Sequence, residues 1–181
     1  MSEASRLSAR MKTVLIWVTL CVAVVTAGRA AQFMGWQIVR DYQLEYREYA
    51  PVVSTELLLE GRNPFGIEAQ PFGINVYGIL YHLVSLPFAA MFGCTLVVHR
   101  VVSCCFIVMT CLCLLWGVRA AGVSWSLSVV AACTAFADAA TGISIAARPD
   151  SLGHLLFLAS LVVPFVFRYS VASLAVSVAL A

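Results

Sequence analysis

The chain has 181 residues, of which 62% are apolar and 11% are charged, and its mean hydropathy is +0.94. This composition excludes an ordinary soluble domain and is typical of an integral membrane protein. The formal net charge is only +2 and no basic block occurs, so no nucleic-acid partner is predicted. We therefore expect an all-α, polytopic transmembrane protein in contact with membrane lipid, with no soluble domain between its spans.

The first apolar run covers about residues 13–32 and follows Arg6, Arg10 and Lys12, with only Glu3 to offset them. By the positive-inside rule, these charges keep the N-terminus cytoplasmic. A cleaved signal peptide has a similar pattern, but the length of this run and the spans after it favour an uncleaved signal anchor. The predicted location is the plasma (inner) membrane, which the chain crosses several times.

Residues 34–97 form the predicted extracytoplasmic loop, which we expect to contain amphipathic surface helices. Six of the nine acidic residues lie between Asp41 and Glu68. If this segment is helical, Asp41, Glu45 and Glu48 share one face, because they are spaced at i, i+4 and i+7. Two interpretations stay open. The segment is either an interfacial helix with acids facing water and tyrosines facing lipid headgroups, or a carboxylate site at the membrane surface.

Local signals predict where helices of this loop begin and end. Pro51 either kinks a helix or restarts one at its first turn. The stretch "EGRNPFG" (60–66) predicts a helix end followed by a turn, with Gly61 as the C-cap glycine. Four acids are interpreted as the solvated side of loop helices: Glu48, Glu56, Glu60 and Glu68.

The run 73–93 decides the predicted topology, because it is long enough to span a membrane but contains polar residues and Pro87. If it lies on the outer surface, Arg119 and Arg168 fall inside, whereas if it spans, Arg148 does. The positive-inside rule therefore favours the surface interpretation. Since the sequence is apolar to its last residue, we expect it to be the N-terminal part of a longer protein. The remaining spans are expected at about 98–117, 123–145 and 152–167, with the start of another at 169–181.

Other polar residues stand in or beside apolar runs. In "ARPD", Asp150 is a candidate N-cap or first-turn acid, and Arg148 either pairs with it or holds a phosphate. Asp138 lies in the outer half of a predicted span, where an acid is costly unless it faces protein or water. His99 and Arg100 begin an apolar run and are expected at the outer headgroup level.

No metal site is predicted. The seven cysteines lie almost entirely in apolar runs, where a thiol behaves as a small hydrophobe, and they lack zinc-ligand spacing. The three histidines are interpreted as polar groups at interfaces rather than as metal ligands. They are His82, His99 and His154.

In their order along the chain, these features resemble membrane glycosyltransferases of the GT-C superfamily that use polyprenyl-phosphate-linked sugars. Protein O-mannosyltransferases and aminoarabinose lipid A transferases are examples. The resemblance rests on "DYQLEYREYAPVVSTELLLEGRNPF" after the first span and "VYGILYHLVSLP" at the start of a surface helix. It continues with "HRVVSCCFIVMTCLCLLWGVR" as an Arg-led span and with "ARPDSLGHLL" after a further span.

The resemblance implies that Asp41 is the catalytic carboxylate of the first loop, with Glu45 as its neighbour or substitute, and that Asp150 is the second acid. It also implies an arginine near the lipid phosphate. The substrate-binding candidates are Arg148, Tyr77 and His82. The implied donor is a polyprenyl-phosphate-linked sugar, and the acceptor is a glycan, lipid or protein. No cofactor is certain, and a divalent cation is a candidate.

A second class of function also fits the sequence. The chain could be a non-enzymatic membrane scaffold or a transporter segment whose acids bind cations or organise partners. In that case Asp138, within the membrane, is the residue that matters, and alteration of Asp41 is silent.

Overall fold

The computed structural model describes residues 3–66, 68, 78–142 and 146–180. Within these residues the chain forms seven α-helices and no strand, which confirms the predicted all-α class. The helices are α1 (Glu3–Ile38), α2 (Tyr49–Leu59), α3 (Leu80–Phe92), α4 (Leu96–Ala120), α5 (Trp125–Thr141), α6 (Asp150–Val166) and α7 (Val171–Leu180).

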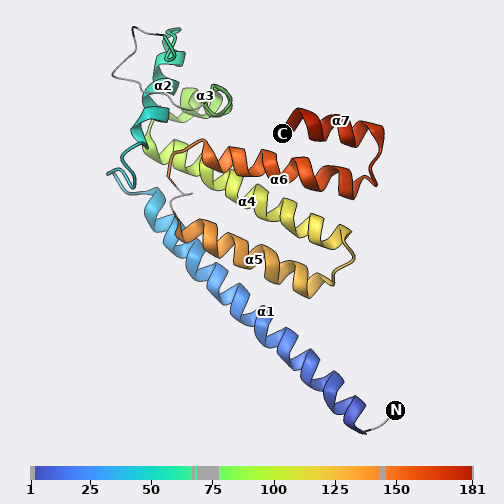
Figure 1. Ribbon diagram of the computed structural model, residues 1–181. Coiled ribbons are helices and arrows are strands. Elements are labelled where there is room, and N and C mark those ends of the chain that lie inside the picture. The colour runs from blue at the N-terminus through green and yellow to red at the C-terminus, as the bar shows by residue number, and fades with distance from the viewer. Residues whose placement is uncertain (1–2, 67, 69–77, 143–145, 181) are drawn as a thin grey trace.

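Four helices, α1, α4, α5 and α6, form a layer of elongated rods in which α1 packs on α5, α5 on α4 and α4 on α6 (Figure 1). Helices α1 and α5 run in one direction, and α4 and α6 run in the other. The short helices α2 and α3 therefore gather where α1 and α5 end and where α4 and α6 begin. We call this region, made of residues 39–48, α2, α3 and 146–150, the loop end.

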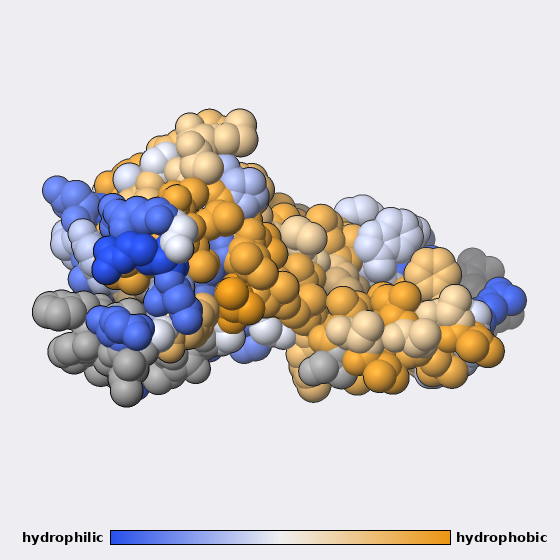
Figure 2. Space-filling view, turned by 90° about the horizontal axis from the view of Figure 1, so that it is seen from above, coloured by the Kyte–Doolittle hydropathy of each residue, from blue (hydrophilic) through white to orange (hydrophobic). Residues whose placement is uncertain are grey.

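Two helices are long and apolar enough to cross a membrane. They are the segment Arg10–Ile38 of α1, with 29 residues, and α4, with 25 residues. At 1.5 Å per residue, each exceeds the roughly 30 Å of a hydrocarbon core. Helices α5 and α6 have 17 residues each and are shorter than that thickness. Apolar residues dominate the length of the molecule, while hydrophilic residues gather at the loop end (Figure 2).

Helix α3 bears on whether the run 73–93 spans a membrane, although residues 73–77 lie outside the described part of the chain. Its 13 residues extend for only about 20 Å, which is too short for a bilayer core. Its buried face carries Tyr81, His82 and Ser85, whereas Met91 and other large apolar side chains are exposed. Both properties favour the surface interpretation over a transmembrane one.

The expected acidic helix face at Asp41, Glu45 and Glu48 is wrong. Residues 40–48 form turns and bends rather than a helix. Asp41 is exposed, Glu45 is half-buried and Glu48 is fully buried, so the three acids do not share a solvated face. A helical spacing of acids was present in the sequence, but contacts from distant segments determine the conformation.

The local signals around α2 are confirmed. The helix begins at Tyr49, which places Pro51 in its first turn, where a missing amide hydrogen costs nothing. It ends at Leu59 with Glu60 as the C-cap, and the next residue, Gly61, has a φ of 72°, the left-handed conformation that glycine adopts without strain. The Gly61 amide donates to the Leu58 carbonyl at 3.1 Å and the Arg62 amide donates to the Leu57 carbonyl at 2.8 Å, which is a Schellman motif.

Small residues allow the long helices to approach closely. Ala30 of α1 is buried against Ala137 and Ala140 of α5. Between α4 and α6, a Cβ atom added at Gly117 would lie 2.7 Å from a methyl group of Val162. Because valine is stiff at χ1, this methyl group has little freedom to move aside. Gly117 therefore sets the separation of α4 and α6.

We expect Gly117→Ala to destabilise the helix layer by about 1–3 kcal/mol, the usual cost of overpacking a close contact. The measurement is the unfolding midpoint of the purified protein in micelles. Gly153→Ala in α6 is the matched control, because nothing lies within 4 Å of the added Cβ atom. Equal midpoints for the two variants would contradict the close α4–α6 contact.

Candidate functional site

A fully buried ion pair joins the loop end to α4. The Nε of Arg100 lies 2.6 Å from Oε1 of Glu48, and its Nη2 lies 2.8 Å from Oε2. Both side chains are 0% exposed. This bidentate geometry is the strongest arrangement of an arginine and a carboxylate. The sequence suggested that Glu48 lies on a solvated face. This is wrong, because its side chain lies inside the protein.

The other hydrogens of Arg100 bind the end of α1. Nη1 donates to the carbonyls of Gln37 (3.2 Å), Ile38 (3.4 Å) and Arg40 (2.5 Å), and Nη2 donates to the carbonyl of Tyr42 (2.6 Å). Carbonyls at a helix C-terminus lack intrahelical partners and attract positive charge. These carbonyls and Glu48 bind Arg100 inside the protein, and its position at the outer headgroup level stays a prediction.

The carboxylate of Glu48 also accepts hydrogen bonds from the backbone of two loops. Its Oε2 accepts a hydrogen bond from the Leu44 amide (2.8 Å), and its Oε1 accepts one from the Ala147 amide (2.9 Å). Burial raises the pKa of Glu48, but hydrogen bonds from Arg100 and from these two amides outweigh burial and lower it below 4.5. The ionised carboxylate of Glu48 therefore stabilises the folded protein fully above pH 4.5, and this stabilisation is lost as the pH falls through the lowered pKa.

Three of the predicted site residues meet at the loop end. Arg148 Nε lies 2.7 Å from Oδ2 of Asp150, and Arg148 Nη1 lies 3.9 Å from Oε2 of Glu45. Asp150 is the first residue of α6 and a first-turn acid, as the sequence predicted. The Glu48 bond to Ala147 fixes the backbone next to Arg148. The acids of the first loop and of "ARPD" thus approach each other across about 100 residues of sequence.

The third candidate acid, Asp41, lies in the same loop as Glu45 but outside this cluster. Arg100 binds the carbonyls of Arg40 and Tyr42, so the backbone on both sides of Asp41 is fixed. The Asp41 side chain itself is exposed. An exposed carboxylate on a fixed backbone is accessible to a substrate without being neutralised by an arginine.

A buried polar chain lies beneath the site and includes the predicted residue His82. The Thr55 hydroxyl lies 3.4 Å from Nδ1 of His82 and 3.1 Å from Nε2 of His99. Burial lowers the pKa of His82 to about 4, so this side chain is neutral at ordinary pH. His82 is 0% exposed, which suits a structural contact between α2, α3 and α4 better than direct substrate contact. The other predicted residue of this motif, Tyr77, lies outside the described residues.

Tyr81 extends this polar chain to the "ARPD" segment. Its hydroxyl donates to the His99 carbonyl at 3.1 Å and lies 3.1 Å from the Ser103 hydroxyl. Ser103 in turn donates to the Arg148 carbonyl at 3.5 Å. Sequence reasoning missed Tyr81, Thr55 and Ser103, because a lone hydroxyl in an apolar run carries no signal of its partner. Arg100 and Glu48 did carry such a signal, because they are opposite charges, one at the start of an apolar run and the other in the preceding loop.

A second polar region lies on the outer face of α1 and α5. An open groove of about 540 Å³ is lined by Arg29 and Asp138 together with Thr26, Thr134 and Thr141. Both charged side chains are exposed, and in the described part of the chain neither has a hydrogen bond or an ion pair. This groove is the structural basis for the second class of function.

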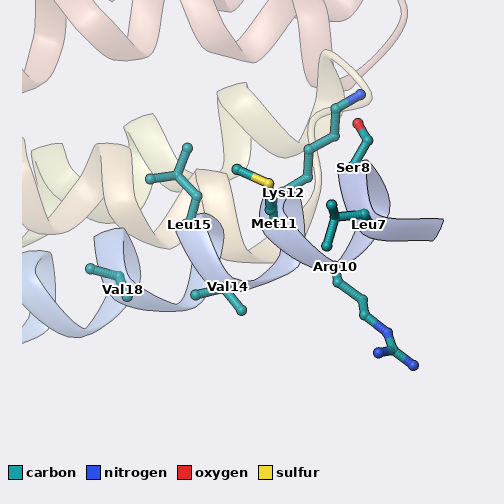
Figure 3. A pocket seen from close by; sticks show the side chains of 8 residues that line it. All are labelled: Leu7, Ser8, Arg10, Met11, Lys12, Val14, Leu15 and Val18. Atoms are coloured by element: carbon teal, nitrogen blue, oxygen red, sulfur yellow. The ribbon is translucent and has the colours of Figure 1, made fainter. Parts of the chain in front are cut away.

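A larger hollow follows the N-terminal half of α1, where this helix extends beyond the others (Figures 1 and 3). It is lined by apolar side chains such as Met11 and Leu15, with Arg10 and Lys12 at its edge. None of the described residues that line it is an acid. Nor do the described residues contain a group of three or more histidine, cysteine or acidic side chains that could hold a metal ion.

No protein-family model, curated protein or solved structure matches this chain. The sequence motifs and the geometry of the loop end are therefore the indications of function in this chain.

We expect Glu48→Gln to destabilise the protein by about 3–5 kcal/mol, because it leaves the Arg100 charge buried without a counter-ion. Glu56→Gln is the matched control: this acid lies in α2 and is exposed, so its loss should change stability by about 0.5 kcal/mol or less. Denaturant titration of both variants in micelles measures the difference. Similar midpoints would show that the buried pair does not hold the loop end.

Proposed function

We propose that the chain is the N-terminal part of a GT-C-type glycosyltransferase that moves a sugar from a polyprenyl-phosphate donor to an acceptor on the extracytoplasmic face. The observation that supports the proposal is the approach of Glu45 and Asp150 to Arg148, with the exposed Asp41 in the same loop as Glu45. The resemblance requires an acid of the first loop and the acid of "ARPD" to serve one site. Their convergence at one end of the helix layer meets this requirement.

The exposed carboxylate of Asp41 is the proposed general base. It takes the proton of the acceptor hydroxyl while the hydroxyl oxygen attacks the anomeric carbon of the sugar. The bond from that carbon to the phosphate oxygen breaks, and its electron pair leaves with the polyprenyl phosphate. An arginine stabilises the additional negative charge that the phosphate acquires when its bond to the sugar breaks.

Glu45 and Asp150 have a different proposed role. Both carboxylates are engaged with Arg148, so neither is as free as Asp41 to accept a proton. Two acids around one guanidinium leave an excess negative charge, to which a divalent cation or a sugar hydroxyl could bind. In this proposal Glu45 is thus a positioning residue for Arg148, and these contacts favour Asp41 over Glu45 as the base.

A non-enzymatic scaffold or transporter segment is the second candidate, and the groove at Arg29 and Asp138 favours it. Unpaired charges at membrane depth are costly unless they face water, protein or an ion. In this case the groove binds a cation or a partner helix, and the loop end is only a structural cap.

Sugar transfer by membranes that contain the full reading frame tests the first candidate. We expect Asp41→Asn to lower the transfer rate by about 100-fold or more, the usual contribution of a general base. Asp150→Asn should lower it less, through misplacement of Arg148. Asp138→Asn is the control, because this residue lies on another face. Unchanged transfer in both site variants would sink the assignment, and a loss in Asp138→Asn as large as that in Asp41→Asn would show that the effect is not specific to the loop end.

The proposed topology places the loop end outside the plasma (inner) membrane and the N-terminus in the cytoplasm. Single cysteines at exposed Arg62 and Arg168 test it in a background without native thiols, because these residues lie at opposite ends of the helix layer. We expect an impermeant thiol reagent on intact cells to label Arg62→Cys but not Arg168→Cys. The reverse pattern, or labelling of both, would overturn the topology.

A further inference from the structure

Arg40 is fixed between two aromatic rings where α1 meets the loop. The centre of its guanidinium group lies 3.3 Å from the centroid of the Trp36 ring and 5.4 Å from that of Tyr42. Trp36 and Tyr42 are both more than half exposed. Stacking of this kind holds a guanidinium in one plane while its hydrogens remain available at the edge.

Arg40 also lacks a counter-charge. In the part of the chain that the structure describes, its side chain has neither a hydrogen bond nor an ion pair, and its Nε is shielded from solvent. The other arginines around it are occupied: Arg100 binds Glu48 and four carbonyls, and Arg148 binds Asp150. The Nη1 and Nη2 atoms of Arg40 are not among the buried atoms without a partner, so their hydrogens are the ones that an acceptor from outside the chain can reach.

The geometry points to Arg40, held by Trp36 and Tyr42, as a binding site for the phosphate group of a lipid at the membrane surface. A planar guanidinium with free edge hydrogens matches two phosphate oxygens. Exposed Trp and Tyr at the end of an apolar helix are typical of the headgroup level, where lipid phosphates lie. By contrast, two carboxylates surround Arg148, and their negative charge would repel a phosphate.

This inference is independent of sugar transfer, although it bears on the proposed function. Arg40 directly precedes Asp41, and Arg100 fixes the backbone carbonyl of Arg40. A phosphate at Arg40 would therefore lie near the proposed base, as a leaving group must. If the lipid is the sugar donor, Arg40 replaces Arg148 as the arginine that stabilises the leaving phosphate.

Native mass spectrometry of the protein in a phosphate-free, non-ionic detergent tests this site. The added probes are a polyprenyl monophosphate, phosphatidylglycerol, the matching polyprenol and inorganic phosphate. The variants are Arg40→Gln, Arg40→Lys and Arg148→Gln, with Arg47→Gln as the matched control. Arg47 lies in the same loop and stacks on Tyr46 at 4.9 Å. Because the assay needs no turnover, it gives a result even if the protein is not a transferase.

We expect wild type to retain the phosphate-bearing lipids and Arg40→Gln to weaken their binding by about tenfold or more. Arg40→Lys keeps the charge but loses the stacked fork, so its loss should be intermediate, which also covers the case in which Arg40→Gln misfolds. Arg47→Gln and Arg148→Gln should bind within about threefold of wild type. A preference for polyprenyl phosphate over phosphatidylglycerol would identify a donor lipid, and equal binding would identify a general headgroup site.

Three results would overturn the inference. The first is equal lipid binding by wild type, Arg40→Gln and Arg40→Lys. The second is equal retention of polyprenol and polyprenyl phosphate, which would remove the phosphate from recognition. The third is retention of inorganic phosphate as strongly as lipid, which would assign the site to a soluble anion. Arg40-dependent lipid binding without sugar transfer would reject the proposed function and leave this site in place.

Discussion

The buried pair of Glu48 and Arg100 is the contact on which the loop end depends. A buried ion pair is not by itself a strong source of stability, because removing two charges from water costs about as much as their attraction returns. Here the balance is improved by the backbone, since four carbonyls and two amides also bind the two side chains. The main effect is positional: the bonds of Arg100 and Glu48 hold the end of α1, the first loop, α4 and the "ARPD" segment in one arrangement.

The candidate residues inherit their positions from this pair. Asp41 lies between two carbonyls bound to Arg100, and Arg148 follows the amide bound to Glu48. The pair thus fixes the backbone at both residues, and Asp150 and Glu45 then orient the Arg148 side chain. The proposed site needs Asp41 without a partner and Asp150 paired with an arginine. Bonds to the backbone can fix both positions without using the carboxylate of Asp41.

Features of the fold that depend on local chemistry could be predicted from the sequence. The apolar runs predicted the long helices, Pro51 the start of α2, and Gly61 its end, since each acts through neighbouring residues. The state of Glu48 could not be predicted in this way. Its spacing from Asp41 is helical, but Arg100, 52 residues away, determines that it is buried. Similarly, the motifs identified Arg148 and Asp150, but only the three-dimensional arrangement shows that Glu45 approaches the same arginine.

The contacts of Glu48 also impose an order on biogenesis. A nascent chain leaves the ribosome from its N-terminus, and segments fold as their partners emerge. The carbonyls at the end of α1 have no arginine until α4 has been synthesised, and Glu48 lacks its last amide until α5 is complete and Ala147 follows. The first loop therefore lacks its buried counter-ion until Arg100, 52 residues after Glu48, has been synthesised, and lacks the bond from Ala147 for longer. The proposed catalytic site is thus among the last parts of the described chain to form, although Asp41 and Glu45 are synthesised long before Arg148 and Asp150.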